Sequence, residues 1–95
     1  MRIVWSAAAW ADVDRLHAFL AERDIDAADR TFDKLLEAPG KLLDFPRRGS
    51  RLRRYHPRDV REFRVAAYLL RYEIDRDEIR VLRFFHTRED RATLS

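Results

Sequence analysis

The chain has 95 residues, no cysteine and a formal net charge of +3 at pH 7. This length suits one domain, residues 1–95, whose core holds without cross-links, and the missing thiols exclude disulfides, thiolate catalysis and cysteine-based zinc sites. No apolar run approaches the roughly 18 residues that span a membrane, and the first residues lack a signal-peptide pattern, so we expect a soluble cytoplasmic protein.

Charge is distributed unevenly along the chain. Residues 1–46 carry six Lys or Arg against nine Asp or Glu, a net −3, whereas residues 47–95 carry fourteen against eight, a net +6. Eighteen of the twenty basic residues are arginine, which suits bidentate and stacked contacts. The second half should therefore meet an acidic partner, either a carboxylate-rich protein segment or a phosphate backbone.

The first residues predict a strand followed by a helix. Residues 2–5 suit a strand at a sheet edge. Ser6 can cap a helix that runs to about Arg23, because apolar residues then recur at three- and four-residue spacing. The expected inner face holds Trp10, Val13, Leu16, Phe19 and Leu20, and the outer face holds Asp12, Asp14, Arg15 and Glu22.

A second helix is predicted to begin with Asp26 as its N-cap and to form a hairpin with the first. Pro39-Gly40 should end or kink it near Ala38. Its inner positions are Ala28, Phe32, Leu35 and Leu36, and Leu42, Leu43 and Phe45 are expected to pack beyond the break.

Residues 46–59 are rich in arginine and follow the second helix. Six arginines in twelve positions repel one another without an acidic partner, which favours a phosphate-binding or acidic-peptide-binding surface over a solvated connection.

Residues 60–86 predict three antiparallel strands, 60–65, 68–74 and 78–86. Closing the first hairpin at Ala66-Ala67 and the second with a tight turn at Arg76-Asp77 brings opposite charges together, since Glu62 then faces Arg71 and Glu73 faces Arg80. We expect a longer loop at Ala66-Ala67, because two-residue turns prefer glycine or asparagine. The predicted fold class is α+β, a helical hairpin packed on a mainly antiparallel four-stranded sheet in the order β-α-α-β-β-β.

This register divides the side chains between two faces of the sheet. The face expected to pack on the helices is mostly apolar and holds Arg61, Phe63, Val65, Tyr68, Leu70, Tyr72, Ile74, Ile79, Val81, Arg83 and Phe85. The other face mixes charged and apolar residues, as a site or a partner surface would, and holds Val60, Glu62, Arg64, Leu69, Arg71, Glu73, Arg80, Leu82, Phe84 and His86.

One group on the mixed face could carry out chemistry. Glu62, Arg64, Arg71 and His86 supply a carboxylate, two cations and an imidazole, which are the groups that RNA cleavage by a 2′-hydroxyl needs. The alternative is that Glu62 and Arg71 form only a solvated cross-strand ion pair. The three histidines lack ligand spacing, and no glycine-rich phosphate loop exists, so no metal and no cofactor are expected.

Arg61 and Arg83 fall on the packed face. A buried arginine usually pairs with a carboxylate, and the available carboxylates are Asp12, Asp14 and Asp44, although a ligand or partner role is also open.

The order of these features resembles that of a known family. The turn after the second helix is Phe45-Pro46-Arg47-Arg48-Gly49, and the strands carry Val60-Arg61-Glu62-Phe63, Tyr68, Tyr72, Val81-Leu82-Arg83 and His86-Thr87-Arg88-Glu89-Asp90. This succession is similar, over almost the whole chain, to the RelE/ParE superfamily of toxins from bacterial type II toxin-antitoxin systems. Pro39-Gly40 departs from the usual unbroken second helix.

The resemblance implies a growth-inhibiting toxin, of a kind linked to plasmid stabilization, that is neutralised by a cognate antitoxin. Such antitoxins join a DNA-binding half to a segment that wraps over the toxin, so operator DNA is expected as a partner only indirectly, through the antitoxin. No membrane partner is expected.

Two activities compete within the superfamily. A ParE-like toxin inhibits DNA gyrase by protein-protein contact and has no catalytic residues, and the expected contact set is Arg53, Arg54, Arg61, Arg83, His86 and Arg88. A RelE-like toxin cleaves messenger RNA on the ribosome, with Glu62 as base, His86 as acid, and Arg64 and Arg71 beside them. The chain lacks the lysine-rich set and the C-terminal tyrosine of RelE-like nucleases, which favours ParE. A non-toxic binding module on the same fold is a third hypothesis.

Overall fold

The computed structural model describes residues 1–89, so Asp90 of the expected motif lies outside the described residues. Its elements are β1 (Arg2–Trp5), α1 (Ala7–Ala21), α2 (Ile25–Glu37), β2 (Ser50–Arg51), β3 (Asp59–Val65), β4 (Tyr68–Asp75) and β5 (Glu78–His86). Short 3-10 turns, η1 (Ala38–Leu42), η2 (Pro46–Arg48) and η3 (Arg53–Tyr55), fill the segment between α2 and β3. No described helix is both long and apolar enough to cross a bilayer.

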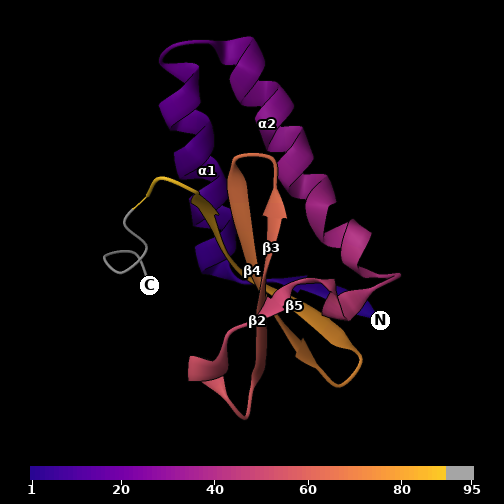
Figure 1. Cartoon of the computed structure of the whole chain (residues 1–95). Coiled ribbons are helices and arrows are strands. Elements are labelled where there is room, and N and C mark those ends of the chain that lie inside the picture. Colours follow the sequence, from indigo (N-terminus) through magenta and orange to yellow (C-terminus); the bar gives the residue numbers. More distant parts are fainter. Residues whose placement is uncertain (90–95) are drawn as a thin grey trace.

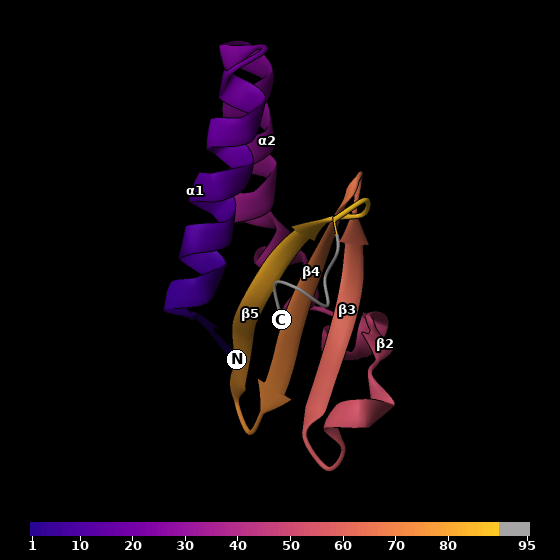
Figure 2. The ribbon, with the colours of Figure 1, turned by 90° about the vertical axis from the view of Figure 1, so that its left-hand side faces the viewer.

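The strands form one sheet in the order β1-β5-β4-β3-β2. β1 runs parallel to β5, and all other neighbouring strands are antiparallel. The two helices form a hairpin beside the sheet, with α1 next to β5, while β2 lies at the opposite edge (Figure 1, Figure 2). The predicted α+β fold is confirmed, with β2 as an additional strand that the sequence did not indicate.

Ser6 begins α1 as predicted, because its side-chain oxygen accepts a hydrogen bond from the backbone N–H of Ala9. The buried face of the helix differs from the expected one and consists of Ala9, Asp12, Val13 and Leu16. Trp10 and Phe19 are exposed instead, and Trp10 stacks on Trp5 with 4.3 Å between ring centroids. The placement of Asp12 on the outer face was therefore wrong.

Asp24, rather than the predicted Asp26, is the N-cap of α2, and its carboxylate accepts a hydrogen bond from the N–H of Ala27. The helix ends at Glu37 and continues as η1, which confirms the break at Pro39-Gly40. Of the residues expected to pack inside, Ala28, Leu35 and Leu42 are buried, whereas Leu36, Leu43 and Phe45 are exposed.

The predicted registers are present in both hairpins near their turns. Glu62 pairs with Arg71 across β3 and β4, and Glu73 pairs with Arg80 across β4 and β5. The expected longer loop at Ala66-Ala67 was wrong, because Val65 pairs directly with Tyr68. Ala66 closes this two-residue turn with a φ of 54°, in the left-handed region.

A β-bulge interrupts the register of β5. Tyr72 pairs with Val81, but the next pair along the strands is Arg71 with Arg83, so Leu82 is an additional residue. α1 contacts the bulge directly, because the Ser6 hydroxyl donates to the carbonyl oxygen of Leu82 at 2.9 Å. Because of the extra residue, each side chain of β5 after Leu82 lies on the opposite face of the sheet from the one predicted.

Phe84 and Phe85 show the effect of the bulge on the core. Phe84 was expected on the mixed face, but it is fully buried in the main core with Leu70 and Tyr72. Phe85 was expected on the packed face, but it is fully buried on the other side of the sheet, against the guanidinium groups of Arg71 and Arg83. Side chains are therefore buried on both faces at this end of the sheet.

Candidate functional site

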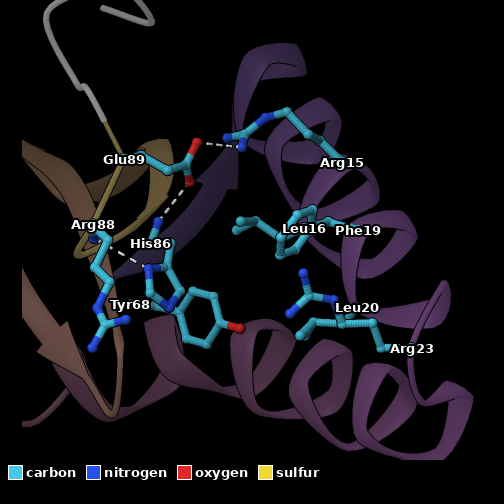
Figure 3. Close-up of a pocket in the computed structure, with 9 residues that line it drawn as sticks. All are labelled: Arg15, Leu16, Phe19, Leu20, Arg23, Tyr68, His86, Arg88 and Glu89. Atoms are coloured by element: carbon cyan, nitrogen blue, oxygen red, sulfur yellow. Dashed lines mark hydrogen bonds and ion pairs between the residues drawn. The ribbon is translucent and has the colours of Figure 1, made fainter.

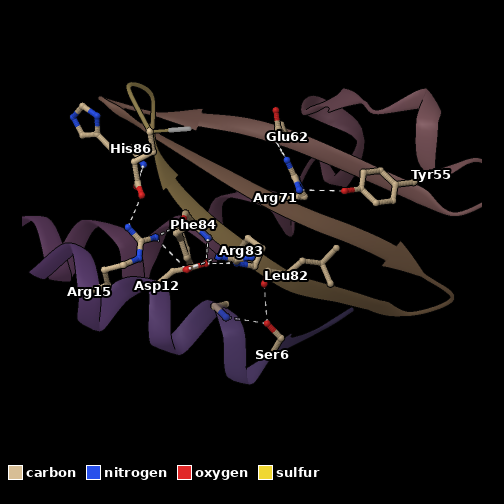
Figure 4. Close-up of polar contacts among 12 residues, drawn as sticks. Ser6, Asp12, Arg15, Tyr55, Glu62, Arg71, Leu82, Arg83, Phe84 and His86 are labelled. Atoms are coloured by element: carbon tan, nitrogen blue, oxygen red, sulfur yellow. Dashed lines mark hydrogen bonds and ion pairs between the residues drawn. The ribbon is translucent and has the colours of Figure 1, made fainter. Parts of the chain in front are cut away.

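A buried carboxylate connects α1 to the second half of β5. Asp12 is 3% exposed and accepts four hydrogen bonds: two from Arg83, at 2.6 and 2.9 Å, one from the backbone N–H of Phe84 at 2.9 Å, and one from Arg15 at 3.1 Å (Figure 4). The hydrogen bonds to Asp12 raise the pKa of Arg83 above its ordinary value. Asp12 is one of the three carboxylates predicted for Arg83, although the bulge moves Arg83 off the packed face.

A tight turn follows β5 and is held in the same network. Glu89 accepts a hydrogen bond from Arg15 at 2.5 Å and a second from the backbone N–H of His86 at 2.7 Å. The Nδ1 atom of His86 accepts from the backbone N–H of Arg88 at 3.1 Å, which assigns the ring proton to Nε2 in the neutral form. α1 thereby fixes the orientation of the imidazole at the strand end.

A hollow of about 660 Å³ opens between α1 and the ends of β4 and β5. Its apolar walls come from Leu16, Phe19, Leu20 and Tyr68, and the ring of His86 lies edge-on to Tyr68 at 5.3 Å (Figure 3). The charged lining residues are Arg15, Arg23, Arg88 and Glu89. A hollow with apolar walls and several lining cations suits a protein segment that carries apolar and acidic side chains.

The second face of the sheet has its own polar centre. Arg71 is 3% exposed and donates two hydrogen bonds to one oxygen of Glu62, at 3.1 and 2.9 Å, and a third to the hydroxyl of Tyr55 at 3.1 Å (Figure 4). Arg58 similarly forms a bidentate pair with Glu73, which lowers the pKa of that carboxyl. Part of the arginine-rich segment, residues 46–59, thus packs on this face of the sheet through Tyr55 and Arg58.

The expected group of Glu62, Arg64, Arg71 and His86 is not assembled. The bulge pairs His86 with Tyr68 on the helix-facing side, while Glu62 and Arg71 lie on the other side of the sheet. Arg64 is exposed and donates to the carbonyl of Ala66. The placement of His86 beside Glu62 was wrong, because the alternation of side chains was counted through Leu82 without the additional residue.

The six expected target-binding residues occupy different environments. His86 and Arg88 lie at the hollow, and Arg83 lies beside it in the pair with Asp12. Arg53 and Arg54 are exposed on η3, where the Arg54 guanidinium lies over the ring of Tyr55 at 4.9 Å. Arg61 is largely buried and engaged, since it donates to Asp59 at 2.8 Å and to the carbonyls of Arg47 and Gly49.

The turn at η2 is held by a buried tyrosine. The hydroxyl of Tyr72 donates to the carbonyl of Pro46 at 2.6 Å and accepts from the N–H of Gly49 at 3.0 Å. A Cβ on Gly49 would lie 2.6 Å from this hydroxyl and 2.9 Å from the backbone oxygen of Glu62, so the close approach requires glycine. Burial raises the pKa of Tyr72.

Sequence reasoning missed Arg15 and Glu89 as members of the site, and it placed Asp12 on the outer face of the helix although it named Asp12 as a possible partner of Arg83. Asp12 lies one turn from both Ala9 and Leu16 on the buried face of α1, so a lone carboxylate within an apolar stripe was the available signal. Among residues 1–89, no three His, Asp or Glu side chains are grouped as metal ligands would be.

A helical hairpin with a mainly antiparallel sheet, in the order β-α-α-β-β-β-β, is the arrangement that the resemblance to toxins of the RelE/ParE superfamily predicted, with one additional strand. A family model described as the ParE toxin of the type II toxin-antitoxin system, parDE, matches residues 3–91. The chain belongs to this ParE toxin family. No curated protein matches the sequence.

A solved structure supports the fold. The chain is similar to a protein in the structure titled "Chromosomal ParDE TA system from P. aeruginosa", with a TM-score of 0.76 and 19% identity. The match covers 90% of this chain and 95% of the other.

Proposed function

We propose that this ParE toxin inhibits DNA gyrase by protein-protein contact and that a cognate antitoxin neutralises it. Membership of the ParE family supports this activity over cleavage of messenger RNA. The observation that carries the choice is the separation of His86 from Glu62 and Arg71, which places the expected acid and the expected base on opposite faces of the sheet. A rigid Arg71, buried and hydrogen-bonded three times, is also unsuited to follow a moving phosphate charge.

The end of β5 is the gyrase contact in this proposal. Arg88 is exposed there, His86 has its orientation fixed by the turn, and Phe19 adds an exposed apolar side chain across the hollow. An apolar anchor with a cation beside it is the composition of the energetic centre of a protein interface. Arg83 supports this contact by holding the strand end to α1 through Asp12.

The test incubates the purified protein with gyrase and supercoiled plasmid, and separately with translating ribosomes. We expect loss of gyrase activity and accumulation of cleaved plasmid, with messenger RNA left intact. Arg88→Glu should weaken inhibition about tenfold, the loss that about 1.4 kcal/mol of contact energy would cause. Arg30→Glu, which makes the same charge change on the exposed side of α2, serves as the matched control. Intact gyrase activity beside cleaved messenger RNA would contradict the proposal.

Neutralisation is tested with the product of a neighbouring antitoxin gene. Adding it before gyrase should protect the enzyme. Protection that Arg88→Glu does not alter would mean that antitoxin and gyrase use different parts of the surface.

A further inference from the structure

Five arginines on and beside β2 and β3 carry charge that no described carboxylate neutralises. Both carboxylates of this region are occupied by other arginines, since Asp59 pairs with Arg61 at 2.8 Å and Glu62 pairs with Arg71 at 2.9 Å. Arg51 also lies 3.6 Å from Asp59, and Arg58 pairs with Glu73 at 2.8 Å. The other five arginines of residues 46–65 are all exposed, and we call them the arginine edge: Arg47, Arg48, Arg53, Arg54 and Arg64.

Charge is segregated between the arginine edge and the helical hairpin. Residues 46–65 contain eight arginines and two acidic residues, a net +6, whereas residues 6–45 contain five basic and nine acidic residues, a net −4. The hairpin lies beside β5, and β2 lies at the other edge of the sheet (Figure 2). A polyanion therefore attracts one edge of the molecule and repels the hairpin, which orients the approach.

Most exposed apolar side chains lie outside the arginine edge, although Phe45 borders Arg47 and Arg48. In the described part of the chain, every exposed large apolar side chain precedes Pro46: Met1, Val4, Trp10, Phe19, Ile25, Leu36, Leu43 and Phe45. A stable protein-protein interface needs an apolar centre, whereas interfaces with DNA are polar and strongly basic. The arginine edge therefore fits a phosphate backbone better than an acidic protein segment.

Tyr55, the tyrosine under Arg54, does not favour single strands. Tyr55 is half-buried, its hydroxyl accepts from Arg71, and its ring lies under the guanidinium of Arg54. Single-strand binders stack successive bases on several accessible aromatic rings. The ring of Tyr55 is already covered, which leaves Phe45, beside Arg47 and Arg48, as the one exposed aromatic ring that borders the arginine edge among residues 1–89. Contacts to the regular backbone of a duplex need no such ring.

We propose that the arginine edge binds the phosphate backbone of duplex DNA directly and without sequence preference. The seven residues of β3 extend about 20 Å, a length along which a duplex presents about a dozen phosphates, at one charge per ~1.7 Å of axis. This contact goes beyond gyrase inhibition and departs from the expectation that DNA is reached only through the antitoxin. It brings the toxin to the polymer on which gyrase acts.

The test measures fluorescence anisotropy of a labelled duplex of about 20 base pairs against the protein alone, between about 50 and 200 mM salt. Five phosphate contacts predict a slope of log K against log salt of about −4.5, so that affinity falls about 20-fold from 100 to 200 mM. The double variant Arg47→Gln/Arg53→Gln should reduce the slope by about 2. Neither side chain makes a described contact, so the fold should be retained.

The matched control is Arg30→Gln/Lys34→Gln, which removes the same charge from α2 and should leave the slope unchanged. Equal losses in the two variants, or no binding at the lowest salt concentration, would overturn the proposal. A polyglutamate peptide that binds more tightly than the duplex would also overturn it, as would a single strand with equal charge that binds as tightly. Gyrase is absent from this assay, so its outcome is independent of the gyrase assay.

Discussion

Replacing Asp12 with asparagine tests the link between α1 and β5. The change removes the charge that holds Arg83 and weakens the acceptor for the N–H of Phe84. Breaking a buried ion pair costs about 3–5 kcal/mol, and because the Arg83 side chain is 20% exposed and can recover some hydration, we expect about 2–4 kcal/mol here. In a domain of this size the melting temperature should fall by roughly 10–25 °C.

Urea unfolding followed by circular dichroism measures the loss, and Asp14→Asn is the matched control. Asp14 is exposed on the same helix and has no described contact, so its replacement should change the free energy of unfolding by less than about 0.5 kcal/mol. An Asp12→Asn protein as stable as this control would refute the reasoning. The double variant Asp12→Leu/Arg83→Met should recover at least half of the loss, because it leaves no unpaired charge.

Three further changes test the sheet. Tyr72→Phe leaves the turn groups at Pro46 and Gly49 without partners and should cost about 1–3 kcal/mol. Because burial raises the pKa of Tyr72, the wild type should also lose stability as the pH rises from about 10, the ordinary pKa of tyrosine, through the raised pKa of the folded state. An identical alkaline loss in the variant would contradict this. Gly49→Ala should cost about 1–3 kcal/mol in thermal unfolding, and an unchanged melting temperature would mean that the turn can move. Because Arg58 lowers the pKa of Glu73, that pair stabilises the fold fully above about pH 4.3, and the stabilisation is lost as the pH falls through the folded pKa. Glu73→Gln should therefore make the free energy of unfolding in urea fall less steeply with decreasing pH. A fall as steep as that of the wild type would refute this.

The local features of the fold could be predicted from the sequence where one residue type had one physical role. Ser6 capped α1 as expected, and Pro39-Gly40 ended α2 near Ala38. Opposite charges selected the correct register at Glu62 and Arg71, because a slip by one residue would have separated them. Other local predictions failed: Asp24 rather than Asp26 capped α2, and Ala66-Ala67 formed a two-residue turn instead of a longer loop.

Features that depend on contacts between distant segments could not be predicted. The bulge at Leu82 is held by Ser6 from the other end of the chain, and the pairing of Ser50-Arg51 as β2 depends on the edge that β3 presents. The only local sign of the bulge was Phe84-Phe85, two adjacent large apolar side chains where alternation predicts one inside and one outside. The site prediction failed at this point, since His86 follows the bulge.

The bulge shifts the alternation of side chains between the two faces by one residue in the last strand. Two toxins of this fold can share the sequence from Val81 to His86 and still place the imidazole on opposite faces of the sheet, if the strand of one of them pairs without a bulge. Motif alignment alone therefore cannot assign such a histidine to nuclease chemistry or to partner contact. The assignment requires knowing whether the last strand has one residue more than the neighbouring strand between the same paired positions.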